Sequence, residues 1–197
     1  MNLALTAKDL ELQPAELKAP SGSDIVLAFV NEDQGVPHGL ALYRDAAHTV
    51  TLGTAEVIVG PAHQVFQIAE GIPNLGNPTA DAFEKALRAK YDFSLQYPRA
   101  VNEMRMFAAA AEKAKSLDPV KVAAALEGME FDVYDGGKGT MRKDDHQFFQ
   151  PMYIASFGER TEKEPFDEEK TGWGWKLVAK IDTPQTVLPT TCKMDRP

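Results

Sequence analysis

The stretch Gly71-Ile72-Pro73-Asn74-Leu75-Gly76-Asn77-Pro78 divides the chain into two parts with different sequence periods. Its glycines and prolines interrupt regular structure, and Asn77 followed by Pro78 is typical of the start of a helix. Before this stretch, short apolar runs alternate with turn residues; after it, apolar residues recur at helical spacing. The stretch therefore predicts a junction between a strand-rich segment and a helical one.

Upstream of the junction, apolar and β-branched runs predict strands, which fall at 3–7, 24–30, 40–43, 55–59 and 64–69. Turn residues separate these runs at short and fairly regular intervals. Such spacing is typical of an antiparallel sandwich or barrel. We therefore expect residues 1–70 to form a β domain.

Downstream of the junction, the sequence predicts three helices, at 78–91, at about 99–115 and from Pro119 onward with Asp118 as its cap. Each helix has an apolar stripe that we expect to be buried. The stripe of the first helix comprises Phe83, Ala86, Leu87 and Tyr91, and that of the second comprises Met104, Phe107, Ala108, Ala111 and Ala114. The stripe of the third helix comprises Val122, Ala125, Leu126 and Met129. Strands are expected at 151–157 and 175–181, with the charged run 159–170 looping out between them. The order predicts an α+β fold with domains at 1–70 and 71–197.

The composition excludes several classes of function. Of 197 residues, 29 are acidic and 21 basic, which leaves a net charge of −8 and disfavours binding to nucleic acid. No apolar run approaches the ~20 residues that span a bilayer, and the first residues do not resemble a signal peptide. The single cysteine, Cys192, excludes an internal disulfide. Neither nucleotide-binding nor serine-hydrolase motifs occur, so these classes of protein lose their usual support, and we single out no catalytic residues.

The downstream segment contains Met141-Arg142-Lys143-Asp144-Asp145-His146-Gln147 and the run from Leu117 to Gly128. With these strings, about residues 72–197 resemble the C-terminal part of type I periplasmic solute-binding proteins of the leucine/isoleucine/valine or short-chain-amide ABC transporter class. The resemblance implies an α/β lobe fragment at 71–197. It also implies a non-enzymatic, incomplete solute-binding protein of the periplasm, which captures an amino acid or amide and docks on an ABC permease. The residues that contact the solute stay unidentified.

The upstream segment contains Gly35-Val36-Pro37-His38-Gly39-Leu40-Ala41-Leu42-Tyr43. With this run, about residues 2–70 resemble a cupredoxin, and the resemblance implies a partial cupredoxin-like β-sandwich in which His38 is a copper ligand. The alternative function is therefore a copper-binding electron carrier with an incomplete site. A type 1 copper site needs two imidazoles and a thiolate. His48 and His63 are the nearby candidates, and the structural alternative is that all three histidines are solvated residues of turns or strands.

Two further motifs have a chemical and a structural interpretation. The string Asp144-Asp145-His146-Gln147 could serve acid–base or metal chemistry, but we expect a turn between two strands. Trp173 and Trp175 share one face of an extended segment, and we expect them in the core rather than in a ligand cleft. A sandwich without its last strands exposes an edge, so we expect either the C-terminal strands to cover that edge or the protein to self-associate.

Overall fold

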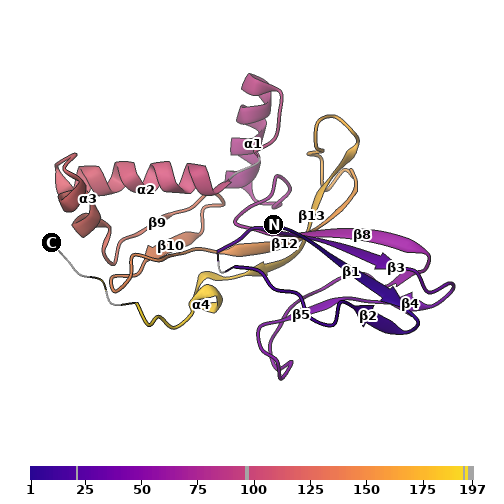
Figure 1. The fold of residues 1–197 in the computed structure, drawn as a ribbon. Helices are drawn as coiled ribbons and strands as arrows, with labels where there is room; N and C mark the ends of the chain where they lie inside the picture. Colours follow the sequence, from indigo (N-terminus) through magenta and orange to yellow (C-terminus); the bar gives the residue numbers. More distant parts are fainter. Residues whose placement is uncertain (21, 96–97, 193, 195–197) are drawn as a thin grey trace.

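A six-stranded mixed sheet occupies one side of the molecule (Figure 1). The computed structural model describes residues 1–20, 22–95, 98–192 and 194. The strand order in the sheet is β13-β12-β8-β3-β1-β2. The strands are β1 (Asn2–Lys8), β2 (Glu11–Gln13), β3 (Ile25–Asn31), β8 (Ala62–Ala69), β12 (Met152–Glu159) and β13 (Trp173–Ile181). β1 and β3 run parallel, and every other neighbouring pair is antiparallel.

Residues 1–70 do not form the antiparallel sandwich that their spacing predicts. The β1–β3 pair is parallel, and β8 pairs with β12, which comes from beyond the junction, with Ala69 opposite Tyr153. Strands from both predicted segments, 1–70 and 71–197, therefore share one sheet. The expectation that C-terminal strands cover an open edge is confirmed, because β12 satisfies the backbone groups of β8 on that side.

A small layer of short strands covers one face of this sheet. β5 (Ala41–Tyr43) pairs with β6 (Thr51–Thr54), and β4 (Pro37–His38) pairs with β7 (Ile58–Val59). The buried cluster beneath this layer comprises Leu5, Ala7, Phe29 and Phe66, with Leu40, Ala55 and Ile58 packed against it. The first seventy residues thus have their core between the sheet and the small layer.

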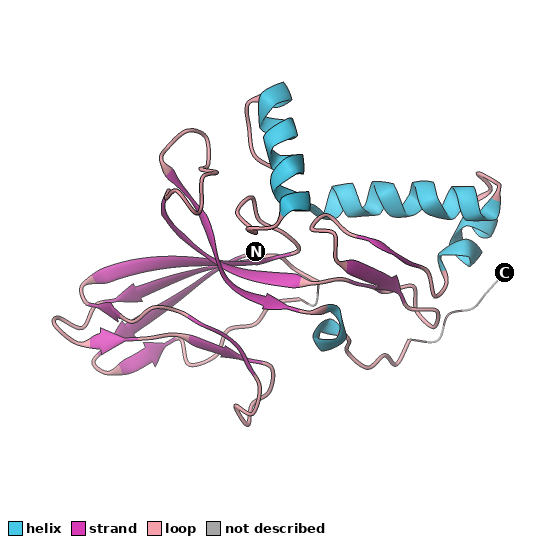
Figure 2. Ribbon diagram, turned by 180° about the vertical axis from the view of Figure 1, so that it is seen from behind, coloured by secondary structure: helices cyan, strands magenta, loops and turns pink. Residues whose placement is uncertain are grey.

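The three predicted helices are confirmed, and they gather with a second small sheet at the other end of the molecule (Figure 2). They are α1 (Pro78–Tyr91), α2 (Pro98–Ala114) and α3 (Pro119–Leu126). The small sheet comprises β9 (Glu130–Asp132), β10 (Lys138–Met141) and β11 (Phe148–Phe149), and the single turn α4 (Thr183–Thr186) follows β13. Within the described part of the chain, no helix has the length and apolar character needed to cross a bilayer.

Local capping explains why the helix starts are readable from the sequence. The side chain of Asn77 accepts a hydrogen bond from the Ala80 amide at 2.9 Å, and Asp118 accepts one from the Lys121 amide at 3.0 Å. In both helices proline occupies the first turn, where its missing N–H is not needed. The buried face of α3 is also as predicted, with Leu126 in the core.

The buried face of α2 differs from the predicted one. Met104 and Phe107, expected in the core, are 70% and 50% exposed, whereas Asn102, Met106 and Ala110 are buried. The predicted stripe omits Asn102 because a buried amide is costly without partners. In α1, likewise, the buried residues are Ala80 and Glu84, while Ala86 and Tyr91 are exposed.

The buried amide of Asn102 has a hydrogen-bond partner at both its oxygen and its nitrogen. Its oxygen accepts a hydrogen bond from the backbone N–H of Tyr134, and its nitrogen donates one to the side chain of Gln150, both at 2.6 Å. These contacts connect α2 to segments more than thirty residues away in the sequence. Tertiary pairing of one polar side chain therefore decides which face α2 buries.

Candidate functional site

A cleft opens where the six-stranded sheet meets the segment that leads to α1. It has a volume of about 310 Å³ and is lined by Met1, Asp24, Val26, Gln67, Gly71, Pro73, Leu95, Glu168 and Trp175. Val26 and Gln67 are cross-strand partners on β3 and β8, so one face of the sheet forms part of the lining. Clefts at the meeting of two structural layers, with apolar walls and a few polar groups, are common sites for small ligands.

Opposite charges meet beside Asp24, which lines the cleft. Glu70 directly follows β8 and is buried, and the Arg99 Nε donates a hydrogen bond to its Oε1 at 2.8 Å. The Arg99 Nη2 also donates to the Gly22 carbonyl at 3.0 Å and lies 3.9 Å from Asp24 Oδ1. The guanidinium of Arg99, whose side chain is 42% exposed, therefore lies between two carboxylates.

The two carboxylates beside Arg99 differ in their environments. Burial raises the pKa of Glu70, and the neighbouring Asp24 raises it further, while the hydrogen bond from Arg99 opposes both effects. Among the described residues, the buried Asp24 Oδ1 receives no hydrogen bond. Asp24 Oδ1 instead lies 3.9 Å from the Arg99 Nη2, and the Asp24 side chain, which is 39% exposed, is a carboxylate that lines the cleft.

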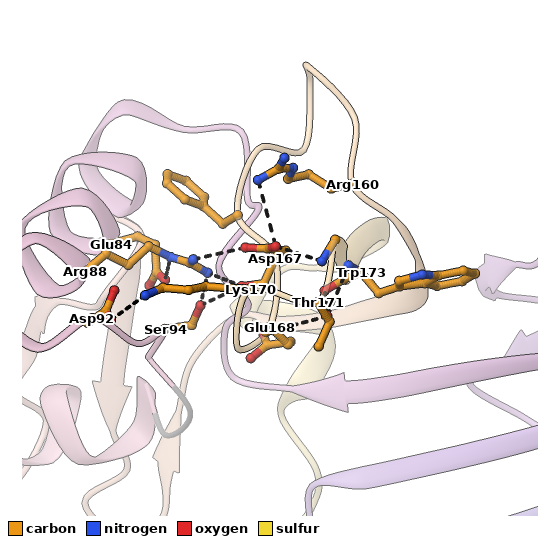
Figure 3. Close-up of polar contacts among 12 residues, drawn as sticks. Glu84, Arg88, Asp92, Ser94, Arg160, Asp167, Glu168, Lys170, Thr171 and Trp173 are labelled. Carbon is orange, nitrogen blue, oxygen red and sulfur yellow. Dashed lines mark hydrogen bonds and ion pairs between the residues drawn. The ribbon is translucent and has the colours of Figure 1, made fainter.

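Another part of the cleft lining, Glu168, lies in the loop between β12 and β13. Arg88 of α1 contacts this loop (Figure 3). The Arg88 Nε donates to Glu84 Oε1 at 2.8 Å, and its Nη1 lies 3.5 Å from Asp167 Oδ1. Arg88 also donates to the Ser94 hydroxyl. Because Glu84 and Ser94 are buried, this network joins α1, the segment after it and the loop at a point shielded from water.

The side chain of Asn74 fixes the backbone beside the cleft. Its amide nitrogen donates to the carbonyls of Phe166 and Trp175 at 2.7 and 2.9 Å, and its oxygen accepts from the Phe166 N–H at 2.9 Å. Gly174 is required here, because a Cβ at that position would lie 2.5 Å from the Phe166 carbonyl oxygen. Glu168 and Trp175 therefore belong to a wall whose backbone is held by these contacts.

The three histidines considered as metal ligands are not brought together. His38 lies on β4 with its Nε2 2.7 Å from Asp33 Oδ2, His48 lies in the β5–β6 turn, and His63 is exposed on β8. Within the described ranges, no group of three or more His, Cys, Asp or Glu side chains is arranged to hold a metal ion. The surroundings of His38 thus do not fit a type 1 copper site, which needs two imidazoles and a thiolate.

The string at 144–147 forms the predicted turn between β10 and β11. Asp145 accepts hydrogen bonds from the Gln147 amide at 3.0 Å and from the Arg142 Nε at 2.8 Å. The hydrogen-bonded Arg142 guanidinium holds the pKa of Asp145 well below its usual range, against the effect of desolvation. The structural interpretation of this motif is confirmed.

The two tryptophans of β13 have different environments. Trp175 is partly buried against the core cluster that includes Ile72 and Tyr153, and it also lines the cleft. Trp173 is 45% exposed and stacks on Phe157 at 6.2 Å between ring centroids, so the prediction that it lies in the core is wrong. Trp175 therefore lines the cleft, although the sequence favours a core position for both tryptophans.

The sequence pattern does not single out the charged residues beside the cleft. Asp24, Glu70 and Arg99 are far apart in the chain, and only folding brings them together. The signal that could have found Glu70 is its position, because a carboxylate at the end of an apolar strand and directly before a glycine is seldom needed for the core.

The profile of the periplasmic binding protein family matches residues 6–162, which is well over half of the chain. The match crosses the junction, so the cupredoxin-like interpretation of residues 1–70 is not supported. No curated protein sequence matches the chain.

Among the solved structures that share the fold are two binding proteins. The leucine-, isoleucine-, valine-, threonine- and alanine-binding protein from Brucella ovis superposes with a TM-score of 0.58 at 19% identity, over 86% of this chain and 40% of its own. A periplasmic binding protein from Burkholderia mallei superposes with a TM-score of 0.50 at 19% identity, over 62% of this chain and 31% of its own. The chain thus spans less than half the length of either protein.

Proposed function

We propose, because this chain belongs to the periplasmic binding protein family, that it binds a small solute as a component of an amino-acid or amide ABC transporter. The proposed site is the cleft between the sheet and the segment that leads to α1. The observation that carries the proposal is the partly exposed Asp24 carboxylate, which lines a cleft that also offers the apolar side chains of Val26 and Trp175. Docking on an ABC permease in the periplasm is part of the same proposal.

The chemistry of the cleft suits a zwitterion or an amide. The ammonium or amide N–H of such a solute would donate to Asp24, in a hydrogen bond that its charge strengthens. The partly exposed guanidinium of Arg99 lies beside this carboxylate and can pair with a solute carboxylate. Trp175 and Val26 offer apolar contacts to the rest of the molecule. Binding needs no bond to be made or broken, so the proposed role is not enzymatic.

The proposal is tested by isothermal titration calorimetry of the full chain with leucine, valine, alanine and propionamide. The first three solutes are among the amino acids for which the Brucella ovis protein is named. We expect saturable binding of at least one solute, and at least tenfold weaker binding in the variants Asp24→Asn and Trp175→Ala. Tenfold corresponds to about 1.4 kcal/mol.

The matched control is Trp173→Ala, which removes the same side chain two residues away on the same strand but outside the cleft lining. Its affinity should equal that of the unaltered chain. The proposal fails if no solute binds, or if Trp173→Ala weakens binding as much as Trp175→Ala does. The groups around His38 do not support the alternative of a copper-binding electron carrier.

A further inference from the structure

A second cavity lies between the six-stranded sheet and the small β5–β6 layer. It has a volume of about 150 Å³, and its lining comprises Leu3, Leu17, Ile25, Leu27, Leu40, Leu42, Gly53, Thr54, Ala55, Phe66, Ile68, Ile154 and Val178. No charged side chain is among them, and only Thr54 has a polar side chain. The cavity shares no lining residue with the solute cleft.

The floor of this apolar cavity follows directly from the strand register. Leu3, Leu27 and Phe66 lie opposite one another on β1, β3 and β8. Ile25, Ile68 and Ile154 form the next row, on β3, β8 and β12. Because side chains alternate between the faces of a sheet, both rows point to the same side. The residue between them on β3, Val26, lines the solute cleft, so the two cavities lie on opposite faces of the sheet.

The roof of the apolar cavity is the β5–β6 layer with Leu17 from the β2–β3 connection. The layer approaches the sheet closely at Gly53, where an added Cβ would lie 2.9 Å from Ile154 Cδ1 and 3.2 Å from Ala179 Cβ. Leu42 and Ala55 of the same layer also line the cavity.

Of the lining residues only Phe66 and Ile154 are fully buried, so the cavity opens to solvent. Water against this apolar lining finds almost no hydrogen-bond partners there, and a nonpolar molecule that displaces it removes apolar surface from water. A volume of about 150 Å³ suits a molecule of the size of benzene. We propose that the cavity beneath the β5–β6 layer binds small nonpolar molecules of the size of benzene or toluene, as a site separate from the solute cleft.

The test is a titration of the methyl-labelled full chain with benzene, followed by ¹H–¹³C spectra. We expect saturable ring-current shifts at the methyl groups of Leu27, Ile68 and Ile154. The methyl groups of Ile72, which belongs to a different core cluster, should not shift. Shifts of equal size at Ile72, or no saturable shift at the three lining residues, would overturn the proposal.

A pair of variants tests the location independently. Ala55→Leu adds three carbon atoms to the cavity and should weaken benzene binding at least tenfold. Ala4→Leu adds the same atoms at an exposed position on the other face of β1 and should leave the affinity unchanged. Equal losses in the two variants would contradict the assignment. Should Ala55→Leu fail to fold, the methyl shifts of the unaltered chain decide the question.

Discussion

Arg88 makes the partly buried contacts that connect α1 to the β12–β13 loop, and the stability of the protein should depend on them. In Arg88→Met, the fully buried carboxylate of Glu84 loses its cationic partner. A buried charge left without its partner costs about 3–5 kcal/mol. We expect a loss of that size in the free energy of unfolding measured with urea.

The matched control for this change is Lys85→Met, which removes a cation from the same helix at an exposed position. Exposed charges contribute little, about 0–1 kcal/mol. If both variants lost the same stability, the Arg88 network would not be the reason that the loop is ordered. The double variant Arg88→Met with Glu84→Gln should recover part of the loss, because no buried charge is then left unpaired.

Asp145 should make the stability of the protein depend on pH in the acid range. Because Arg142 lowers the pKa of Asp145 in the folded state, the carboxylate form favours folding. This stabilisation is complete above the ordinary aspartate pKa of about 4 and is lost as the pH falls below that value. In a plot of the urea unfolding midpoint against pH, we expect Asp145→Asn to reduce the slope in the acid range. The exposed neighbour variant Asp144→Asn should retain the slope of the unaltered chain.

At the scale of single residues, the sequence predicts caps and turns but not the cleft. Asn77, Asp118 and the turn at 144–147 act on neighbours within a few positions, so their roles are visible in the local pattern. The pairing of Glu70 with Arg99 spans 29 positions and depends on the whole fold. No local rule places those two side chains together.

At the scale of elements, Asn77 should contribute more than an ordinary helix cap. Its oxygen caps α1, and its nitrogen also donates to the Asp135 carbonyl at 2.7 Å. Asn77→Ala loses both hydrogen bonds, and we expect a cost of about 1–2 kcal/mol in urea unfolding. Asp118→Ala removes only the cap of α3 and should cost about 1 kcal/mol or less. A cost at Asn77 no greater than at Asp118 would mean that the bond to Asp135 does not stabilise the fold.

The helices could be predicted as elements because their caps and prolines are local. The sheet could not, because strand pairing is set by partners far away: β8 meets β12, which lies beyond all three helices. Short strands such as β4 and β7, with two residues each, carry no readable period. The buried face of α2 could not be predicted either, because the hydrogen-bond partners of Asn102, which are Tyr134 and Gln150, lie far from it in the sequence.

At the scale of the whole molecule, the shared sheet makes the two predicted segments depend on each other. Both tryptophans lie on β13, whereas far-UV circular dichroism reports mainly the helices. Because β8 is paired with both β3 and β12, we expect tryptophan fluorescence and circular dichroism to give the same midpoint of thermal unfolding. Two separate midpoints would instead support independent domains at 1–70 and 71–197.

Self-association stays a prediction at this scale. β13 is the last strand of the six-stranded sheet, and it exposes Trp173 and Leu177. Exposed edge strands are templates for pairing with another chain. Light scattering over a range of protein concentrations measures this directly.

The proposed function requires a small solute to bind in the cleft between the sheet and the segment that leads to α1. The most direct measurement is a titration of the ¹⁵N-labelled full chain with leucine and then with propionamide, followed by ¹H–¹⁵N spectra. We expect saturable shifts at the amides of Gln67, Gly71 and Leu95 and at the indole N–H of Trp175, which line the cleft, and none at the indole of Trp173. Shifts that do not saturate, or that fall on Trp173 and leave the cleft residues unchanged, would contradict it.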